Sequence, residues 1–311
     1  MSAILVVTTL PDPHVEMVKK HLSSDANVVI FDPKTLALSG GFTLSDAGLL
    51  STLDGVNPTS IWYRKPKYVS DAELEKMGIP KDLISAISSL HEEGFSLISE
   101  AYPESLWVSK PTAIKSASNK LLQTLIAKKI GFRVPETIFS TDPVAIEGLR
   151  SRVGDIVIKP LGRPFATVNG IPSWFFATVI PSSQTMDYEG LGLTPMIFQQ
   201  LIHKLFDLRV TIIGNKIFGC KIVSDQVDWR TVQSKPDTLY TPFELDRNII
   251  EKCLLMNQQL GLNFGAYDFA YSKEGEYVFL EINPNGQWGF VEDKTGLPLS
   301  KTMAELLTGS L

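Results

Sequence analysis

The stretch from residue 264 to residue 286 limits most strongly what this chain can fold into. Apolar residues dominate both sides of Glu274-Gly275, with polar residues at spaced positions, which is the pattern of two paired β-strands joined by a short turn. If these two residues form the turn, Lys273 pairs with Glu276 and the rest of the register follows by counting outward. The sequence therefore predicts a β-hairpin with one defined pairing.

Three oxygen-bearing side chains gather on one face of this hairpin. The register places Asp268 directly opposite Glu281, and Asn283 lies two residues further on the same face. Two carboxylates in such positions repel each other unless a cation lies between them. Because the set has hard oxygen ligands and no His or Cys, it points to Mg²⁺ rather than zinc. We predict a metal site here; the alternative is a solvated face of an edge hairpin.

The first third of the chain predicts an open α/β sheet, because short β-rich runs alternate with helical patterns. The strands are expected at 3–9, 28–31 and 60–63, and helices at 15–22 and 81–102. A further helix is expected over 113–130, opened by Pro111 and closed by Gly131. We place the first domain boundary near residue 111.

The remaining sequence predicts two smaller α+β units. Strands are expected at 136–139, 156–159, 174–180 and 196–202, hairpins at 206–223 and 264–283, and helices at 143–149 and 243–260. The polar stretch 181–194 is interpreted as a loop or linker. The predicted domains are therefore 1–111, 112–195 and 196–311.

The hairpin over 206–223 leaves one pairing open. Asp207, Arg209 and Thr211 share one face of its first strand. A three-residue loop around residue 215 would put Lys221 opposite Arg209, whereas a two-residue loop would put Cys220 there.

Composition narrows the functional classes. A formal net charge of −5 gives no global attraction to nucleic acid or to an anionic membrane. No apolar run has the length of a membrane span, and the N-terminal run lacks the basic flank of a signal peptide. Cys220 and Cys253 each lie alone in an apolar stretch, which indicates a reducing compartment. We predict a cytoplasmic protein with no nucleic-acid or membrane partner.

The metal-binding pattern resembles a known family. The run Leu-Glu281-Ile-Asn283-Pro-Asn285-Gly, with Asp268 on the neighbouring strand, is similar to the metal-binding end of ATP-grasp enzymes. Further matches follow the family's order: Asn119-Lys120, Lys159-Pro160, Gln199-Gln200-Leu201-Ile202 and Asp207-Leu208-Arg209. The resemblance implies an α/β ATP-grasp fold with an N-terminal pre-ATP-grasp sheet, a small central lid subdomain and a C-terminal catalytic subdomain.

The resemblance also implies roles for individual residues. Lys120 and Lys159 would contact ATP phosphates or the adenine, and Gln199, Gln200, Leu201 and Ile202 would form the hinge that binds adenine through its backbone. Asn285 and Arg209 complete the expected nucleotide contacts, and Arg209, Arg230 and Lys221 are expected to act on the transferring group. Asp268, Glu281 and Asn283 would hold magnesium, so the implied cofactors are ATP and Mg²⁺. The loop from Gly162 to Gly170 would form a lid.

Three further segments narrow the resemblance to one subfamily. Ile61-Trp-Tyr-Arg-Lys-Pro66, Asp228-Trp-Arg230 and Asn283-Pro-Asn-Gly-Gln-Trp288 are similar to the graspetide (microviridin-type) ribosomal peptide maturases. Lys65 stands where these enzymes are expected to have arginine, and Gln200 where many have glutamate. The resemblance implies a homodimer that binds a precursor peptide, with a leader site between the middle and C-terminal segments and an acidic core.

Such enzymes phosphorylate Asp or Glu side chains, and a Ser/Thr hydroxyl or Lys amine of the same peptide then closes an ester or amide. Two alternatives stay open. One is a RimK-like ligase that adds an amino acid to a peptide or protein, and the other is a module that binds nucleotide or peptide without turnover.

Overall fold

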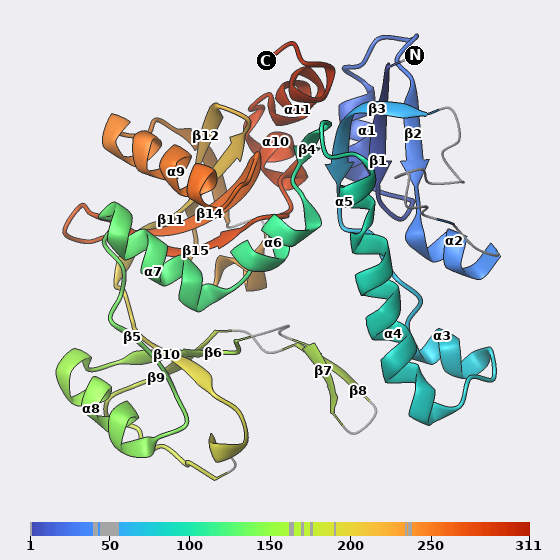
Figure 1. Ribbon diagram of the computed structural model, residues 1–311. Coiled ribbons are helices and arrows are strands. Elements are labelled where there is room, and N and C mark those ends of the chain that lie inside the picture. The colour runs from blue at the N-terminus through green and yellow to red at the C-terminus, as the bar shows by residue number, and fades with distance from the viewer. Residues whose placement is uncertain are drawn as a thin grey trace.

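The computed structural model describes residues 2–39, 43, 56–161, 165–168, 171–174, 177–189, 191–233, 235 and 238–311. These residues form three main sheets (Figure 1). None of the helices within these ranges combines the length and the apolar character that crossing a membrane requires.

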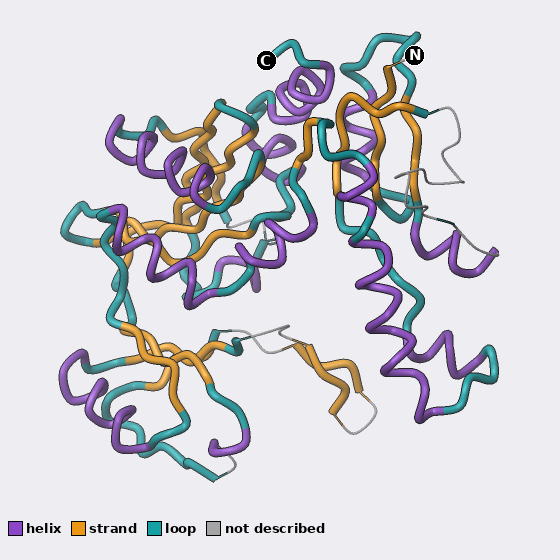
Figure 2. The backbone as a smooth tube through the Cα atoms, in the orientation of Figure 1, coloured by secondary structure: helices purple, strands orange, loops and turns teal. Residues whose placement is uncertain are grey.

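The N-terminal part is an open α/β sheet, as the sequence predicts, and its strands are parallel. Its strands run in the order β2-β1-β3-β4, which is an open sheet with crossover connections. The strands are β1 (Ser2–Val7), β2 (Val28–Phe31), β3 (Asn57–Tyr63) and β4 (Leu106–Val108). The helices of this part are α1 (Pro13–Lys19), α2 (Pro33–Ser39), α3 (Asp71–Lys76), α4 (Lys81–Ser96) and α5 (Ile98–Ala101). Helix α4 extends away from the sheet and carries α3 at its far end (Figure 2).

The predicted helix over 113–130 is two helices. They are α6 (Pro111–Ala117) and α7 (Lys120–Ile130). The break falls at Asn119, whose side chain accepts a hydrogen bond from the backbone N–H of Leu122 and so starts a new helix. The predicted end is confirmed, because Gly131 adopts the left-handed conformation at φ 91° that favours glycine.

The middle sheet has the order β5-β10-β6-β9. Its strands are β5 (Thr137–Ser140), β6 (Ile156–Lys159), β9 (Thr178–Ile180) and β10 (Met196–Gln200), and α8 (Pro143–Val153) packs on it through Ile146 and Leu149. A separate two-stranded ribbon consists of β7 (Phe165–Val168) and β8 (Ile171–Trp174), and a 3₁₀ turn, η2, spans Leu191–Leu193. The ends of the expected lid loop, Gly162 and Gly170, lie outside the described residues.

The C-terminal sheet is antiparallel, in the order β13-β12-β11-β14-β15. Its strands are β11 (Lys204–Ile213), β12 (Lys216–Val223), β13 (Leu239–Phe243), β14 (Phe264–Ser272) and β15 (Tyr277–Asn283). Helices α6, α7 and α9 (Arg247–Gln259) pack in the core cluster on one face of this sheet. The sheet therefore takes two helices from the segment that we assigned to the middle domain, and the middle sheet takes β10 from the C-terminal one.

The other face of the C-terminal sheet shares a core with the N-terminal domain. Ile213, Cys220 and Phe264 from this sheet pack in one cluster with Val6 and Trp62 from the parallel sheet. Helices α10 (Gly289–Thr295) and α11 (Leu299–Thr308) contribute to the same cluster. Because one apolar core spans both parts, the end of β3 is held firmly against the end of β15.

The hairpin over 264–283 has the predicted Asp268–Glu281 pairing but a different turn. Asp268 lies opposite Glu281, as predicted, but Ser272 donates its backbone N–H to Glu276, so the predicted pairing of Lys273 with Glu276 is wrong. The turn is one residue longer than expected. The register shifts again beyond Phe269 because Leu280 is an extra, bulged residue in β15.

Candidate active site

Two carboxylates and two arginines form the centre of the candidate site. Arg209 lies opposite Asp268 on neighbouring strands, and its Nη1 donates to Asp268 Oδ2 at 2.8 Å. Arg230 Nη1 lies 3.3 Å from Glu281 Oε1. Since Asp268 and Glu281 are themselves opposite each other on β14 and β15, the two carboxylates lie side by side between the two arginines.

Arg230 is held in place by its own loop. The 3₁₀ helix η3 (Trp229–Val232) begins after Asp228, which accepts the backbone N–H of Arg230. Arg230 Nε and Nη2 donate to the two oxygens of the same Asp228 carboxylate at 2.8 and 2.7 Å. This fork-to-fork contact fixes the plane of the guanidinium. Trp229, between them, is buried in the shared core and anchors the loop.

Two lysines approach from the middle of the chain. Lys120, the first residue of α7, places its Nζ 3.6 Å from Glu281 Oε2 and 3.4 Å from the carbonyl of Pro160. Lys159, at the end of β6, donates to Gln199 Oε1 at 2.8 Å. Both lysines come from positions that the sequence singled out, and both lie at the boundary between the middle and C-terminal sheets.

The electrostatics of the two carboxylates differ. Burial alone would raise the pKa of Glu281, but Lys120, Arg230 and Lys159 together lower that pKa below its ordinary value. Burial raises the pKa of Asp268, and the negative charge of Glu281 adds to the rise while Arg209 opposes it. The neighbouring cations therefore outweigh the effect of burial at Glu281 but not at Asp268.

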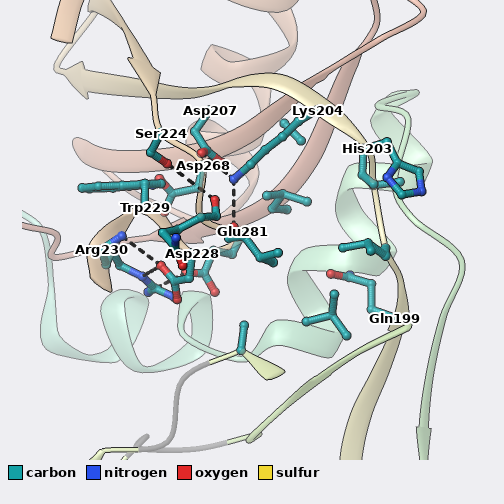
Figure 3. A pocket seen from close by; sticks show the side chains of 18 of the residues that line it. Gln199, His203, Lys204, Asp207, Ser224, Asp228, Trp229, Arg230, Asp268 and Glu281 are labelled. Carbon is teal, nitrogen blue, oxygen red and sulfur yellow. Dashed lines mark hydrogen bonds and ion pairs between the residues drawn. The ribbon is translucent and has the colours of Figure 1, made fainter. Parts of the chain in front are cut away.

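A cavity of about 370 Å³ opens beside this centre (Figure 3). Its walls include the predicted hinge together with Val157, Lys159 and Leu280. Within the hinge, the backbone N–H groups of Gln200 and Leu201 donate to the carbonyls of Glu136 and Asp155. Contacts to an adenine would therefore come from other backbone groups of the hinge.

The wall of the cavity also contains an ion pair that the sequence did not indicate. Lys204 Nζ donates to Asp207 Oδ2 at 2.5 Å and to the carbonyl of Val227 at 2.8 Å. In a regular strand these two side chains would point to opposite faces, but a bulge at Leu205 brings them together. Burial raises the pKa of Asp207 to about 6, with Lys204 opposing. No signal in the sequence indicates this bulge.

A second cavity of about 720 Å³ lies on the other side of the charged centre. It is lined by the N-terminal domain through Tyr63 and Glu93, by Lys115 and Lys120, and by Asn283. Arg230 and Glu281 line both cavities. The two cavities thus meet at one arginine and one carboxylate.

Comparison with known proteins shows which fold contains this site. No protein-family model and no curated protein matches the chain. Among solved structures, a RiPP-associated ATP-grasp ligase from Chryseobacterium gregarium, in complex with ADP and a leader and core peptide, is 24% identical. It covers 100% of this chain and 98% of its own, with a TM-score of 0.86. The macrocyclase MdnC from Microcystis aeruginosa, bound with precursor peptide MdnA, is 25% identical. It covers 99% and 100%, with a TM-score of 0.83.

The chain has the ATP-grasp fold. The D-alanyl-alanine synthetase A from Vibrio cholerae, at 11% identity, is a more distant match that covers 99% of this chain and 98% of its own, with a TM-score of 0.60. The RiPP-associated ATP-grasp ligase and the macrocyclase MdnC, which both match the chain over its whole length, are proteins of the kind that its motifs predict.

The residues present are suited to the metal site that the ATP-grasp resemblance implies. Asp268 Oδ1 is buried and has no hydrogen-bond partner among the described residues, which suits a carboxylate oxygen that binds a cation. Glu281 lies across from it, and the exposed Asn283 follows on the same strand. Within the described ranges no three His, Cys, Asp or Glu residues gather as a metal cluster. The candidate set is therefore two carboxylates with one amide oxygen, suited to a hard cation.

Two predicted site residues lie elsewhere. The β11–β12 hairpin has a two-residue turn, which pairs Arg209 with Cys220 and turns Lys221 to the opposite face. There its Nζ lies 4.5 Å from the centre of the Phe206 ring, so the expectation that Lys221 acts at the site is corrected. Asn285 lines neither cavity, because its side chain is bonded to the N-terminal domain.

Gln123 is a further site-positioning residue that the sequence did not indicate. Its side-chain amide donates to the carbonyl of Ile282 at 2.9 Å and accepts the backbone N–H of Ile282 at 3.0 Å. β15 is an edge strand, so Gln123 completes its hydrogen bonding as a neighbouring strand would. Because Ile282 lies between Glu281 and Asn283, this contact fixes both candidate ligands.

Proposed function

We propose that this ATP-grasp protein is an ADP-forming ligase that activates Asp or Glu side chains of a ribosomal precursor peptide. The observation that carries the proposal is that Arg230 and Glu281 line both cavities. A nucleotide in the hinge-lined cavity and a carboxylate in the second cavity would meet at these two residues. That is the geometry that phosphoryl transfer between two bound molecules requires.

The proposed reaction has two balanced steps. A substrate carboxylate oxygen attacks the γ-phosphorus of ATP, which forms an acyl phosphate and releases ADP. A hydroxyl or amine of the same peptide then attacks the acyl carbon, loses its proton and displaces inorganic phosphate. Each ester or amide therefore removes one water from the mass of the peptide. No side-chain nucleophile of the enzyme is needed.

The residues divide the work by charge. Asp268, Glu281 and Asn283 would hold Mg²⁺, which supplies charge neutralisation at the phosphates. Lys120 and Lys159 orient the phosphate chain as point charges. Arg230, fixed by Asp228, and Arg209 stabilise the charge that develops on the transferring group.

A peptide partner is supported by the second cavity and by the structural neighbours. The cavity contains the cationic side chains of Lys115, Lys120 and Arg230, which suit an acidic core. The Chryseobacterium ligase is described with a leader and core peptide, and MdnC with precursor peptide MdnA. We propose that this chain likewise binds a leader and an acidic core segment.

We also propose a homodimer that works in the cytoplasm. Leu83, Leu90 and Leu97, seven residues apart along α4 and at its C-cap, are 52%, 66% and 52% exposed. Such spacing keeps apolar side chains on one side of a helix, and a second copy of the same helix offers a complementary surface. Light scattering of the wild type and of Leu90→Glu tests this: the variant is expected at half the wild-type mass. The described cysteines, Cys220 and Cys253, are unpaired, which suits a reducing compartment.

The experiment that tests the function is the intact mass of an acidic precursor peptide containing Ser, Thr and Lys, after incubation with the protein, ATP and Mg²⁺. Loss of one water per linkage, absent with Glu281→Gln, is expected. A mass gain that needs an added amino acid would instead establish the RimK-like ligase. ADP release without any change in the peptide would leave only the ATP-hydrolysing fold, and no ADP at all would favour a binding module.

A further inference from the structure

Arg64 lies outside the reaction centre, yet its side chain is almost completely buried, which is rare for an arginine. It follows β3 at the end of the N-terminal sheet and is 2% exposed. Its Nε lies 3.6 Å from Asp12 Oδ2, so its charge is matched within the N-terminal domain. Its two terminal nitrogens contact the loop that follows β15, and Nη2 also lies 3.1 Å from His14 Nδ1.

The contacts of Arg64 fall on two residues of that loop. Nη2 donates to Gln287 Oε1 at 2.6 Å, and Nη1 lies 3.4 Å from both the carbonyl and the side-chain oxygen of Asn285. Asn285 Nδ2 in turn donates to the carbonyl of Tyr63 at 3.2 Å. Hydrogen bonds in both directions therefore hold the loop against the end of β3.

The same loop carries the contacts of the reaction centre. Asn283, the last residue of β15, is a candidate metal ligand, and its Oδ1 accepts the backbone N–H of Asn285 in the loop at 3.1 Å. The carbonyl of Gln287 accepts Arg209 Nη2 at 3.0 Å, while Nη1 of that arginine bonds Asp268. Gln287 thus stands between Arg64 and Arg209, with its side chain on one and its carbonyl on the other.

The loop has little space to move at this point. A Cβ added to Gly286 would lie 2.8 Å from Arg209 Nη2 and 2.8 Å from the Cβ of Ala266. His14, from α1, holds the far end, because its Nε2 accepts the backbone N–H groups of Trp288 and Gly289 at 3.3 and 3.1 Å. Nδ1 of the same ring lies 3.4 Å from Asp12 Oδ1 and 3.1 Å from Arg64 Nη2, so His14 links this end of the loop to Arg64.

We propose that Arg64 is a positioning residue for the magnesium–nucleotide complex, acting through Asn285 and Gln287 on Asn283 and Arg209. It touches no cavity wall itself. Its role is to make the N-terminal domain part of the metal site, so that the oxygen of Asn283 and the guanidinium of Arg209 are held before the nucleotide binds. Residues that orient metal ligands in this way typically change metal affinity by about 10–100-fold when removed. The inference rests on the proposed function.

The test is nucleotide binding rather than turnover. ADP affinity of Arg64→Gln is measured by calorimetry with Mg²⁺ and with a chelator. The gain in affinity on adding Mg²⁺ is expected to fall about 10–100-fold, whereas the affinity without metal stays at the wild-type value, because Arg64 lines no part of the hinge cavity. Arg64→Lys is expected to be impaired as well, since one ammonium cannot replace the two-nitrogen grip.

Arg150 provides the matched control. Like Arg64, it is a buried arginine, 8% exposed, that lines neither cavity. Its guanidinium donates to the carbonyls of Pro181, Ser182 and Gln184, and not to the loop after β15. Arg150→Gln is expected to lower the melting temperature and leave the magnesium gain unchanged.

Gln287→Ala is a second variant, in case the Arg64 variants do not fold. Because Gln287 is exposed, the substitution removes only the side-chain hydrogen bond with Arg64. It is expected to show the same reduced gain. A folded Arg64→Gln or Gln287→Ala with the wild-type gain would overturn the inference while the proposed function stands. A wild-type protein whose ADP affinity does not respond to Mg²⁺ would overturn both.

Discussion

Asp268 and Glu281 lie directly opposite each other on β14 and β15, yet each carboxylate is paired with a different arginine. Arg209 takes Asp268 at 2.8 Å and Arg230 takes Glu281 at 3.3 Å. Among the described residues, the second oxygen of Asp268 has no hydrogen-bond partner, while Glu281 has Lys120 as well. Each carboxylate therefore has one arginine, and only Glu281 has a further cation beside it.

Replacing Glu281 with Gln should abolish ATP turnover and leave the fold intact. The neutral amide removes one metal ligand and the charge that Lys120 and Arg230 face. ADP release and the melting temperature are the measurements. Glu276→Gln is the control on the same hairpin, since Glu276 pairs with Arg133 at the distant turn. Full activity in Glu281→Gln would refute the metal assignment.

Activity should fall as the pH drops through about 6. Burial raises the pKa of Asp207 to about 6, so the carboxylate takes up a proton there and its ion pair with Lys204 is lost. Lys204 also holds the carbonyl of Val227, in the loop that leads to Arg230. A profile of kcat/KM for ATP between pH 5 and 8 tests this, and Asp207→Asn should remove the step. Because the pKa is raised, protonation of this group stabilises the fold while it weakens the site.

The contribution of His14 to the stability of the fold should decrease as the pH falls, whereas that of Asp207 increases. Burial lowers the pKa of His14, with Asp12 opposing and Arg64 assisting. The unfolded chain therefore takes up this proton before the folded one, and stability is lost as the pH falls from about 6.5 toward the folded pKa. Chemical unfolding of the wild type and His14→Gln between pH 5 and 8 measures it. The advantage of the wild type should shrink toward pH 5, and a constant difference would contradict the prediction.

Replacing Gln123 with Leu should destabilise the protein and slow turnover together. The substitution leaves the N–H and C=O of Ile282 without their buried partner, which costs on the order of 1–3 kcal/mol for each unsatisfied group. Urea unfolding gives the stability, and the KM for ATP reports the displaced Glu281. The neighbouring Thr124→Val is the comparison, because Thr124 only bonds its own helix at Lys120. Equal kinetics in both variants would show that Gln123 acts on stability alone.

Several features of the fold could be predicted because a few neighbouring residues encode them. The strand periodicity of 264–283 predicts the hairpin and puts Asp268 opposite Glu281. The error in the turn did not matter, since the bulge at Leu280 restores the register. Gly131 ends α7 as predicted, because its left-handed backbone conformation is a local preference.

Other features could not be predicted, either because local patterns left two outcomes open or because they depend on distant segments. The pairing of Arg209 with Cys220 rather than Lys221 follows from a turn whose two candidate lengths the sequence could not separate. The helix break at Asn119 depends on a single capping bond. Asn285, expected at the nucleotide, is instead bonded to Tyr63 and Arg64.

The sequence by itself determined the strand and helix patterns, the charged residues of the centre and their order along the chain. Only the tertiary structure decided that Arg64, His14 and Gln287 form one hydrogen-bonded network. His14 and Gln287 lie 273 positions apart in the sequence (287 − 14). Periodicity and capping act over a few residues and can be read from them. Contacts between distant segments exist only after the shared apolar core has brought the N-terminal and C-terminal sheets together.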